Sequence, residues 1–178
     1  MQQQVAPGKY PLSLRLLHWL MAFIIIALLI VGLIMTGLPG NDPLRPTLYA
    51  LHKSFGLTVF LLAALRLFLR LKEGVPPLPE IIARSERMLA QAGHWAFYVF
   101  FAAMPLSGYL MTNSFGMPVK WFGIELPRLI GVDKDRGHLL ADFHAYAAYT
   151  LIGLITLHVL AVVVHYVKER VNLLKRMV

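Results

Sequence analysis

The sequence predicts an all-α integral membrane protein: one four-helix transmembrane bundle over residues 1–178, with both termini in the cytoplasm. Composition is the first indication, because 58% of the 178 residues are hydrophobic, only 15% are charged and the mean hydropathy is +0.64. A soluble domain of this size is far less apolar. The second indication is the stretch 143–167, which contains no Asp, Glu, Lys or Arg and exceeds the roughly 20 residues that cross a bilayer. Three further apolar stretches precede it.

The first two spans are bounded by clear helix-breaking segments. A span is predicted over residues 12–38, where Leu16–Leu38 is free of charge and lacks a small-residue cleavage site, so we expect it to be retained rather than removed as a signal peptide. The Gly- and Pro-rich segment 37–43 ends it. A second span is predicted over 47–71, and the segment 73–79, with three prolines, breaks it.

The third and fourth spans enclose the longest connection. The third is predicted over 91–112 with a kink at Pro105, after a short amphipathic lead-in that carries Arg84, Glu86 and Arg87. Residues 113–137 are rich in Gly and Pro and too polar to span, so we expect an ordered loop that caps one mouth of the bundle. The fourth span is predicted over 141–167, with His138 in the polar loop before it.

The orientation follows from the basic residues. The side that holds the termini and the second-to-third connection carries eleven of them: Lys9, Arg15, Arg66, Arg70, Lys72, Arg84, Arg87, Lys168, Arg170, Lys175 and Arg176. The other side carries six: Arg45, Lys53, Lys120, Arg128, Lys134 and Arg136. The positive-inside rule therefore places both termini in the cytoplasm.

Two classes of partner or cofactor are disfavoured. The sequence has no cysteine, which excludes disulfides, iron–sulfur ligation and thiolate zinc sites. The net charge of +8 is concentrated beside apolar segments, where basic residues act as topology signals, so we expect a lipid bilayer and no nucleic acid as the partner surface.

Histidines within the spans form two layers. His144 and His158 are fourteen residues apart in the fourth span, which returns them to within about 40° of the same helix face while separating them by about 21 Å. His18 shares the cytoplasmic half of the membrane with His158, and His52 shares the outer half with His144. Ionisable side chains at such depth are functional candidates by default.

Two opposed imidazoles in each layer suit a b-type haem. A low-spin haem takes one imidazole on each axial face, and its apolar macrocycle suits the core of a membrane bundle. Zinc would require a third or fourth ligand, and neither layer has a nearby Asp, Glu or Cys. We therefore expect two haem b groups, with His18, His52, His144 and His158 as the metal ligands. The alternative is that these histidines are polar residues satisfied within an ordinary bundle.

Four further residues are candidates for cofactor contact. Arg66 and Arg70 follow His52 by fourteen and eighteen residues and share its face, where they would meet haem propionates or a quinone headgroup, or act as topology anchors. His94 lies in the inner layer, where it would replace a ligand or, as we favour, hydrogen-bond a propionate. His165 lies near the cytoplasmic surface. Two alternatives carry equal weight for it: a quinone-site or proton-transfer residue, or an interfacial histidine without a role.

Small residues give a further indication of cofactor space. Gly32 stands fourteen residues after His18, and Gly56 stands one turn after His52. A missing side chain at these positions would let a porphyrin approach the helix.

Several motifs together resemble the bacterial cytochrome b561 family, and within it the small dihaem proteins that act as superoxide oxidases. These motifs are Leu16-Leu17-His18-Trp19, Leu51-His52 followed by Gly56, Arg66-Leu67-Phe68-Leu69-Arg70-Leu71-Lys72 before Pro76-Pro77, Gly93-His94, Trp121-Phe122-Gly123, and His144 with His158 and His165. The resemblance covers nearly the whole chain. It implies a bacterial inner-membrane protein with a cytoplasmic haem on His18 and His158, a periplasmic haem on His52 and His144, and a ubiquinone-like partner.

The expected activity is that of a superoxide:quinone oxidoreductase. Superoxide would give one electron to the outer haem, and Lys53, Lys120 and Arg136 would steer the anion to it. The alternative is a non-enzymatic cytochrome b subunit that anchors a periplasmic dehydrogenase or hydrogenase, with the long loop docking a periplasmic redox protein. A histidine-lined metal transporter is disfavoured, because the spans contain almost no carboxylates.

Overall fold

Four long helices make up most of the computed structural model, which describes residues 8–79 and 81–178. They are α1 (Leu12–Gly37), α2 (Arg45–Glu73), α3 (Arg84–Ser114) and α4 (Lys134–Lys168). The remaining elements are β1 (Val119–Trp121), β2 (Ile124–Leu126) and the short 3-10 helix η1 (Leu173–Arg176). Each long helix is apolar enough over enough residues to cross a membrane, which confirms the predicted four-helix class.

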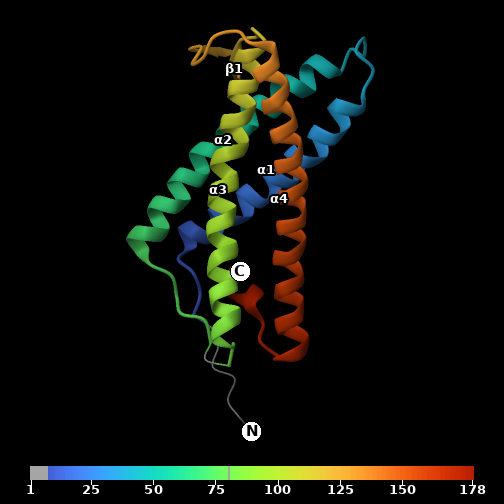
Figure 1. The fold of residues 1–178 in the computed structure, drawn as a ribbon. Helices are drawn as coiled ribbons and strands as arrows, with labels where there is room; N and C mark the ends of the chain where they lie inside the picture. The colour runs from blue at the N-terminus through green and yellow to red at the C-terminus, as the bar shows by residue number, and fades with distance from the viewer. Residues whose placement is uncertain (1–7, 80) are drawn as a thin grey trace.

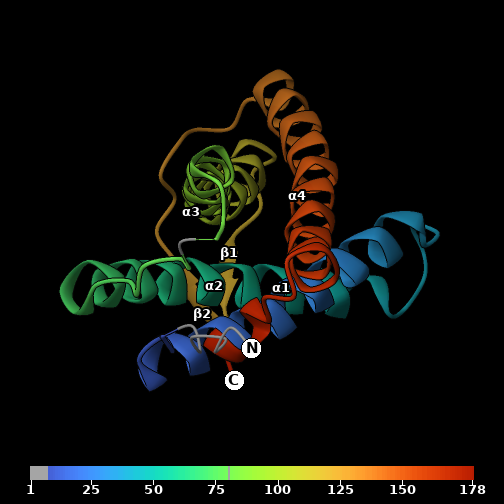
Figure 2. The same ribbon diagram turned by 90° about the horizontal axis from the view of Figure 1, so that it is seen from below.

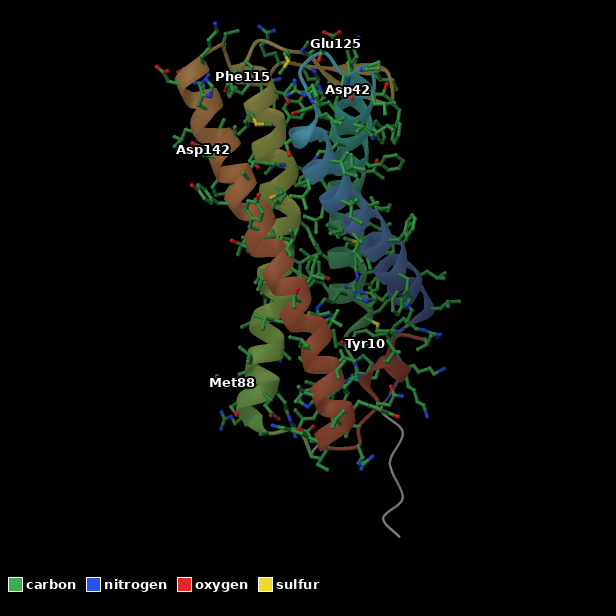
Figure 3. All side chains as sticks on the ribbon, turned by 90° about the vertical axis from the view of Figure 1, so that its right-hand side faces the viewer. Tyr10, Asp42, Met88, Phe115, Glu125 and Asp142 are labelled. Carbon is green, nitrogen blue, oxygen red and sulfur yellow. The ribbon has the colours of Figure 1, made fainter. Side chains whose placement is uncertain are left out.

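The helices form two hairpins that pack across each other. Figures 1 and 2 show α3 and α4 side by side along the molecule, with α1 and α2 as an oblique pair packed across them. We call the end with the α1–α2 and α3–α4 connections the hairpin end. The opposite end, with both chain ends and the α2–α3 connection, is the terminal end. In Figure 3, Asp42, Phe115 and Glu125 lie at the hairpin end, and Tyr10 and Met88 lie at the terminal end.

The last two helices begin earlier than the sequence predicts. The first two agree with prediction within two residues, but α3 begins at Arg84 rather than 91 and α4 at Lys134 rather than 141. Asp133 caps α4 by accepting a hydrogen bond from the backbone N–H of Arg136 at 3.0 Å. Apolar patterning identifies only the part of a helix that lies in lipid, so polar first turns are missed. His138, predicted in a loop, therefore lies within α4 against Phe115 (ring centroids 5.2 Å apart).

A β-hairpin closes the hairpin end. Strands β1 and β2 pair antiparallel around Phe122 and Gly123, whose φ angles of 46° and 91° suit a tight two-residue turn. The turn is fastened to α2, because the Phe122 N–H donates to Ser54 Oγ (3.0 Å) and Trp121 Nε1 donates to Thr58 Oγ1 (3.2 Å). The long connection is thus an ordered cap, as predicted, although its strands were not foreseen.

A buried arginine fastens the terminal end. Arg176 is only 3% exposed, and its guanidinium donates to the carbonyls of Gly8, Pro76 and Pro77 and stacks on Tyr10 at 5.3 Å. The Tyr10 N–H donates back to the Arg176 carbonyl at 3.0 Å. Burial lowers the pKa of Arg176 from its ordinary value. The two chain ends and the α2–α3 connection are therefore held together on one side of the bundle.

The apolar core lies midway along the helices. Its buried residues come from α1, α2 and α4 and are Met21, Ile25, Val59, Ala63 and Leu151. Aromatic residues of α3 pack against them. These side chains fall between the two sequence-predicted histidine layers, so the core separates the layers from each other.

Candidate functional site

The first histidine pair lies towards the hairpin end. His52 on α2 and His144 on α4 face each other with ring centroids 6.3 Å apart. They border a cavity of about 690 Å³ that all four helices and the hairpin cap line with mainly apolar side chains. A cavity of this size and polarity suits a bound organic cofactor.

The spacing of this pair fits one metal ion held between two imidazoles. A metal about 2.0 Å from each nitrogen, with each ring centre about 1.1 Å further back, places the centroids about 6.2 Å apart. The observed 6.3 Å matches this value. A haem with two axial histidines is therefore compatible with both the rings and the space around them.

Glycines make room for both rings. A Cβ added at Gly32 of α1 would lie 3.3 Å from His52 Cε1, and one added at Gly108 of α3 would lie 3.3 Å from His144 Cε1. Gly56, the other glycine expected beside a cofactor, lines the cavity with no atom within 4 Å of an added Cβ. The small residues that the sequence singled out therefore do border the histidines and the open space.

The two rings differ in their hydrogen bonding. His144 Nδ1 lies 2.9 Å from the hydroxyl of Ser107, which is only 4% exposed. His52 Nδ1 is buried and has no hydrogen-bond partner among the described residues. His144 is thus anchored by a hydroxyl at Nδ1, whereas His52 has no hydroxyl partner and lies within reach of the Leu28 carbonyl.

Cations lie around the mouth of the cavity. Arg45, Tyr49 and Lys53 line it, and Lys120 of β1 is close enough to Lys53 for their charges to interact. The Arg45 guanidinium lies 5.5 Å from the Tyr49 ring centre, and its buried Nε has no partner in the described part of the chain. An anion at this mouth would meet at least two positive groups.

Arg136, the third residue predicted to steer an anion, is placed differently. Its guanidinium donates to Ser114 Oγ at 3.2 Å and to the Gly131 carbonyl, and lies 3.8 Å from the Asp133 carboxylate. It is not among the described residues that line the cavity. These bonds hold the connection before α4 and engage the Arg136 guanidinium there.

Three histidines meet in the second layer, towards the terminal end. His158 of α4 lies with its ring centroid 6.4 Å from that of His18 on α1 and 6.0 Å from that of His94 on α3. Phe97, one turn after His94, packs edge-on against His158 at 5.5 Å. The structure brings His18 and His158 together, as predicted, and it places His94 at a similar distance from His158. Distance alone therefore does not decide whether His18 or His94 is the partner of His158.

Both predicted arginines approach this cluster from α2. Arg66 donates to the hydroxyl of Tyr98 at 2.9 Å, and its charge is near enough to act on His18, His94 and His158. Arg70, one turn further on, acts on His94 in the same way. The terminal-end layer therefore combines three imidazoles with two guanidinium groups.

His165 lies beyond this layer, in the last turn of α4. Its Nδ1 is 2.7 Å from Glu169 Oε2, and Glu86 from the first turn of α3 completes a half-buried group. The nitrogen and oxygen atoms of the three residues lie within 4.8 Å of one another. Such a group would hold a proton or a metal ion between the ends of two helices.

Several site residues were missed by the analysis of the sequence. Arg45 precedes His52 by seven residues, which is two helical turns, so spacing could have placed it on the same face. Tyr98 follows His94 by four residues, so spacing could have placed it in the terminal-end layer. Ser107 and Gly108 carry no comparable signal, because α3 has no histidine in the hairpin-end layer from which to count. Only the rotation of α3 against α4 brings these two residues to the site.

Comparison with known proteins identifies relatives over nearly the full length. The chain is 28% identical over 173 residues to cytochrome b561 homolog 2 of Escherichia coli (strain K12), covering 96% of this chain and 92% of that protein. It is also 28% identical over 166 residues to the probable superoxide oxidase CybB of Yersinia pestis, covering 90% of each.

The family match extends over almost all of the described residues. The model for prokaryotic cytochrome b561 matches residues 9–178. This family implies membrane electron transfer through b-type haem, which agrees with paired imidazoles inside a bundle of four membrane-spanning helices. The chain is therefore a multi-pass protein of the bacterial inner membrane that belongs to the prokaryotic cytochrome b561 family.

Proposed function

We propose that the protein is a dihaem cytochrome b that oxidises superoxide at one side of the membrane and reduces a quinone. The observation that carries this proposal is the His52–His144 pair, 6.3 Å apart beside a 690 Å³ cavity with cations at its mouth. One relative named as a probable superoxide oxidase supports it. In this proposal the hairpin end faces the periplasm, and the terminal end, with both termini, faces the cytoplasm.

Four histidines would hold the two haem groups. His52 and His144 would bind one, and His18 and His158 the other, since His18 and His158 are 6.4 Å apart, close to the spacing of the first pair. A b-type haem, when bound, supplies a one-electron carrier. His94 would hydrogen-bond a propionate, because it lies beside Arg66 and Arg70, the cations that a propionate would also contact.

The hairpin end would receive the anion. Lys53 and Lys120 form a local positive site at the cavity mouth, and Arg136 adds a more distant charge. Clustered cations raise the local concentration of a small anion and its rate of encounter, even where acidic residues balance the total charge. The cavity wall is mainly apolar, so water would be limited near the reacting edge.

The terminal end would serve quinone reduction. Two superoxide anions lose one electron each and leave as two oxygen molecules, and the two electrons with two protons convert one quinone to quinol. Arg66 and Arg70 would attract the quinone headgroup or haem propionates. His165, hydrogen-bonded to Glu169 at 2.7 Å, would pass protons from the aqueous side.

The test is a stopped-flow optical experiment on the detergent-purified protein under anaerobic conditions. Superoxide is delivered within milliseconds, with and without added ubiquinone analogue. We expect fast reduction of the haem bands and their re-oxidation when quinone is present. Haem bands that do not change when superoxide is added would contradict the proposed activity. A protein without haem bands would contradict the ligand assignment as well.

A second candidate function is favoured by the surface of the hairpin end. Five apolar residues of the long connection are each between 49% and 63% exposed: Met117, Phe122, Ile124, Leu129 and Val132. Exposed apolar residues on a cap are typical of a docking surface. The protein would then be an electron-transfer subunit for a periplasmic dehydrogenase or hydrogenase, and its haem would be reduced by that protein and not by superoxide.

A further inference from the structure

The segment Pro105–Gly108 of α3 forms a socket for His144. Gly108 leaves room for the ring, since an added Cβ would come within 3.3 Å of Cε1. Ser107, 4% exposed, places its hydroxyl oxygen 2.9 Å from Nδ1. The two residues thus contact the same imidazole from adjacent positions on one helix.

Ser107 can make both of its hydrogen bonds at once only when His144 carries its proton on Nδ1. A serine hydroxyl has one hydrogen, and that of Ser107 is donated to the Met104 carbonyl at 2.9 Å. Its oxygen is then the acceptor of an Nδ1–H bond from His144. The Met104 carbonyl also lies within reach of this imidazole, as the Leu28 carbonyl does for His52. With its proton on Nδ1, His144 presents the lone pair of Nε2 for ligation.

His52 lacks the hydroxyl contact. It too lies against a glycine, with an added Cβ at Gly32 3.3 Å from its Cε1. Its Nδ1, however, is buried without a hydrogen-bond partner in the described part of the chain. The two rings therefore each have a glycine and a backbone carbonyl beside them, and only His144 has a hydroxyl at Nδ1.

We propose that Ser107 is a positioning residue that fixes the tautomer of His144 and strengthens it as an axial ligand, so that the two ligands of the hairpin-end haem are unequal. This inference rests on the proposed haem ligation. An imidazole whose Nδ1–H is hydrogen-bonded is a more basic ligand, and a more basic axial ligand favours the oxidised iron. Ser107 therefore lowers the reduction potential of this haem.

The test is a spectroelectrochemical titration of the purified holoprotein and three variants. We expect Ser107→Ala to keep two haems per chain and to make one of them three- to tenfold more reduced at the same applied potential, which is about 28 to 59 mV for one electron. Ser107→Thr, which retains the hydroxyl, restores the potential. Thr150→Ala is the matched control: Thr150 of α4 is not among the described residues that line the cavity, and its hydroxyl donates to the Tyr146 carbonyl at 2.9 Å.

Some results of this titration would overturn the inference, and one would require a further variant. Unchanged potentials in Ser107→Ala, or an equal shift in Thr150→Ala, would overturn it. If Ser107→Ala loses the haem, Ser107→Cys decides, because a thiol has similar size and is a weaker acceptor: an upward shift supports the inference and an unchanged potential overturns it. A wild-type protein without haem would instead be a failure of the proposed function.

Discussion

The two ends of the bundle hold their histidines in different ways. At the hairpin end two imidazoles face each other across a cavity, with glycines behind the rings and cations only at the mouth. At the terminal end three imidazoles and two arginines gather, and His158 lies at similar ring distances from two partners, 6.4 Å from His18 and 6.0 Å from His94. The distances therefore indicate a single pair of candidate ligands at the hairpin end. At the terminal end they leave both His18 and His94 as candidate partners of His158.

This difference follows from the neighbours of each layer. The hairpin end is closed by backbone, through a β-hairpin fastened to Ser54 and Thr58 of α2, which leaves room inside. The terminal end is closed by the side chain of Arg176 and has arginines inside the bundle. The proposed function assigns the small anion to the first arrangement and the larger redox partner, with its proton supply, to the second.

Removing a histidine of the hairpin-end pair is expected to have the largest effect. His144→Ala should reduce the haem content from two per chain to one, because the remaining imidazole leaves one axial face open. Superoxide-driven haem reduction should fall by about 100-fold or more. Haem is measured by the pyridine haemochrome assay. His138→Ala, the same change on the same helix outside the pair, should keep both haems, and a His144→Ala protein with two haems would exclude His144 as a ligand.

The choice at the terminal end is decided by a pair of variants. His18→Ala should lose the second haem, whereas His94→Ala should retain it with an altered potential, because His94 acts through a propionate. The measurement is haem content combined with a redox titration. The reverse pattern would make His94 the ligand and leave His18 outside the site.

Loss of the Arg176 contacts is expected to destabilise the terminal end without touching either histidine pair. Arg176→Ala leaves the carbonyls of Gly8, Pro76 and Pro77 without their donor, at a cost of about 2–4 kcal/mol. Circular dichroism on heating should show a lower midpoint temperature of unfolding, while the haem spectrum at low temperature is retained. Lys175→Ala, at an exposed neighbouring position, is the control. An unchanged midpoint would mean that other contacts suffice to close this end.

The smallest expected effect concerns charge at the cavity mouth. The double variant Lys53→Gln/Lys120→Gln should slow haem reduction by superoxide about two- to tenfold at low ionic strength, and the difference should shrink as salt screens the charges. Lys72→Gln, an exposed residue of the terminal end, controls for net charge. Equal rates at every salt concentration would remove the two lysines from the substrate path.

Sequence analysis could predict the layers because depth and face along one helix follow from residue spacing. His144 and His158, fourteen residues apart, were placed on one face of the fourth span, and α4 carries both towards their predicted partners. Helices α3 and α4 begin before the predicted spans, at Arg84 and Lys134, because their first turns are polar. Arg136 was grouped with Lys53 and Lys120 by charge alone, and its bonds to Ser114 and Gly131 depend on how the loop folds.

Composition and spacing were sufficient for the four spans, the shared side of the termini and the depth of each histidine, because these depend on hydropathy and on the constant rise and turn of a helix. The contact of Ser107 with His144, the approach of His94 to His158 and the cation pair at the cavity mouth depend on how neighbouring helices rotate and cross. That rotation is set by the packing of many side chains at once. It therefore emerges only when all four helices and the cap are assembled.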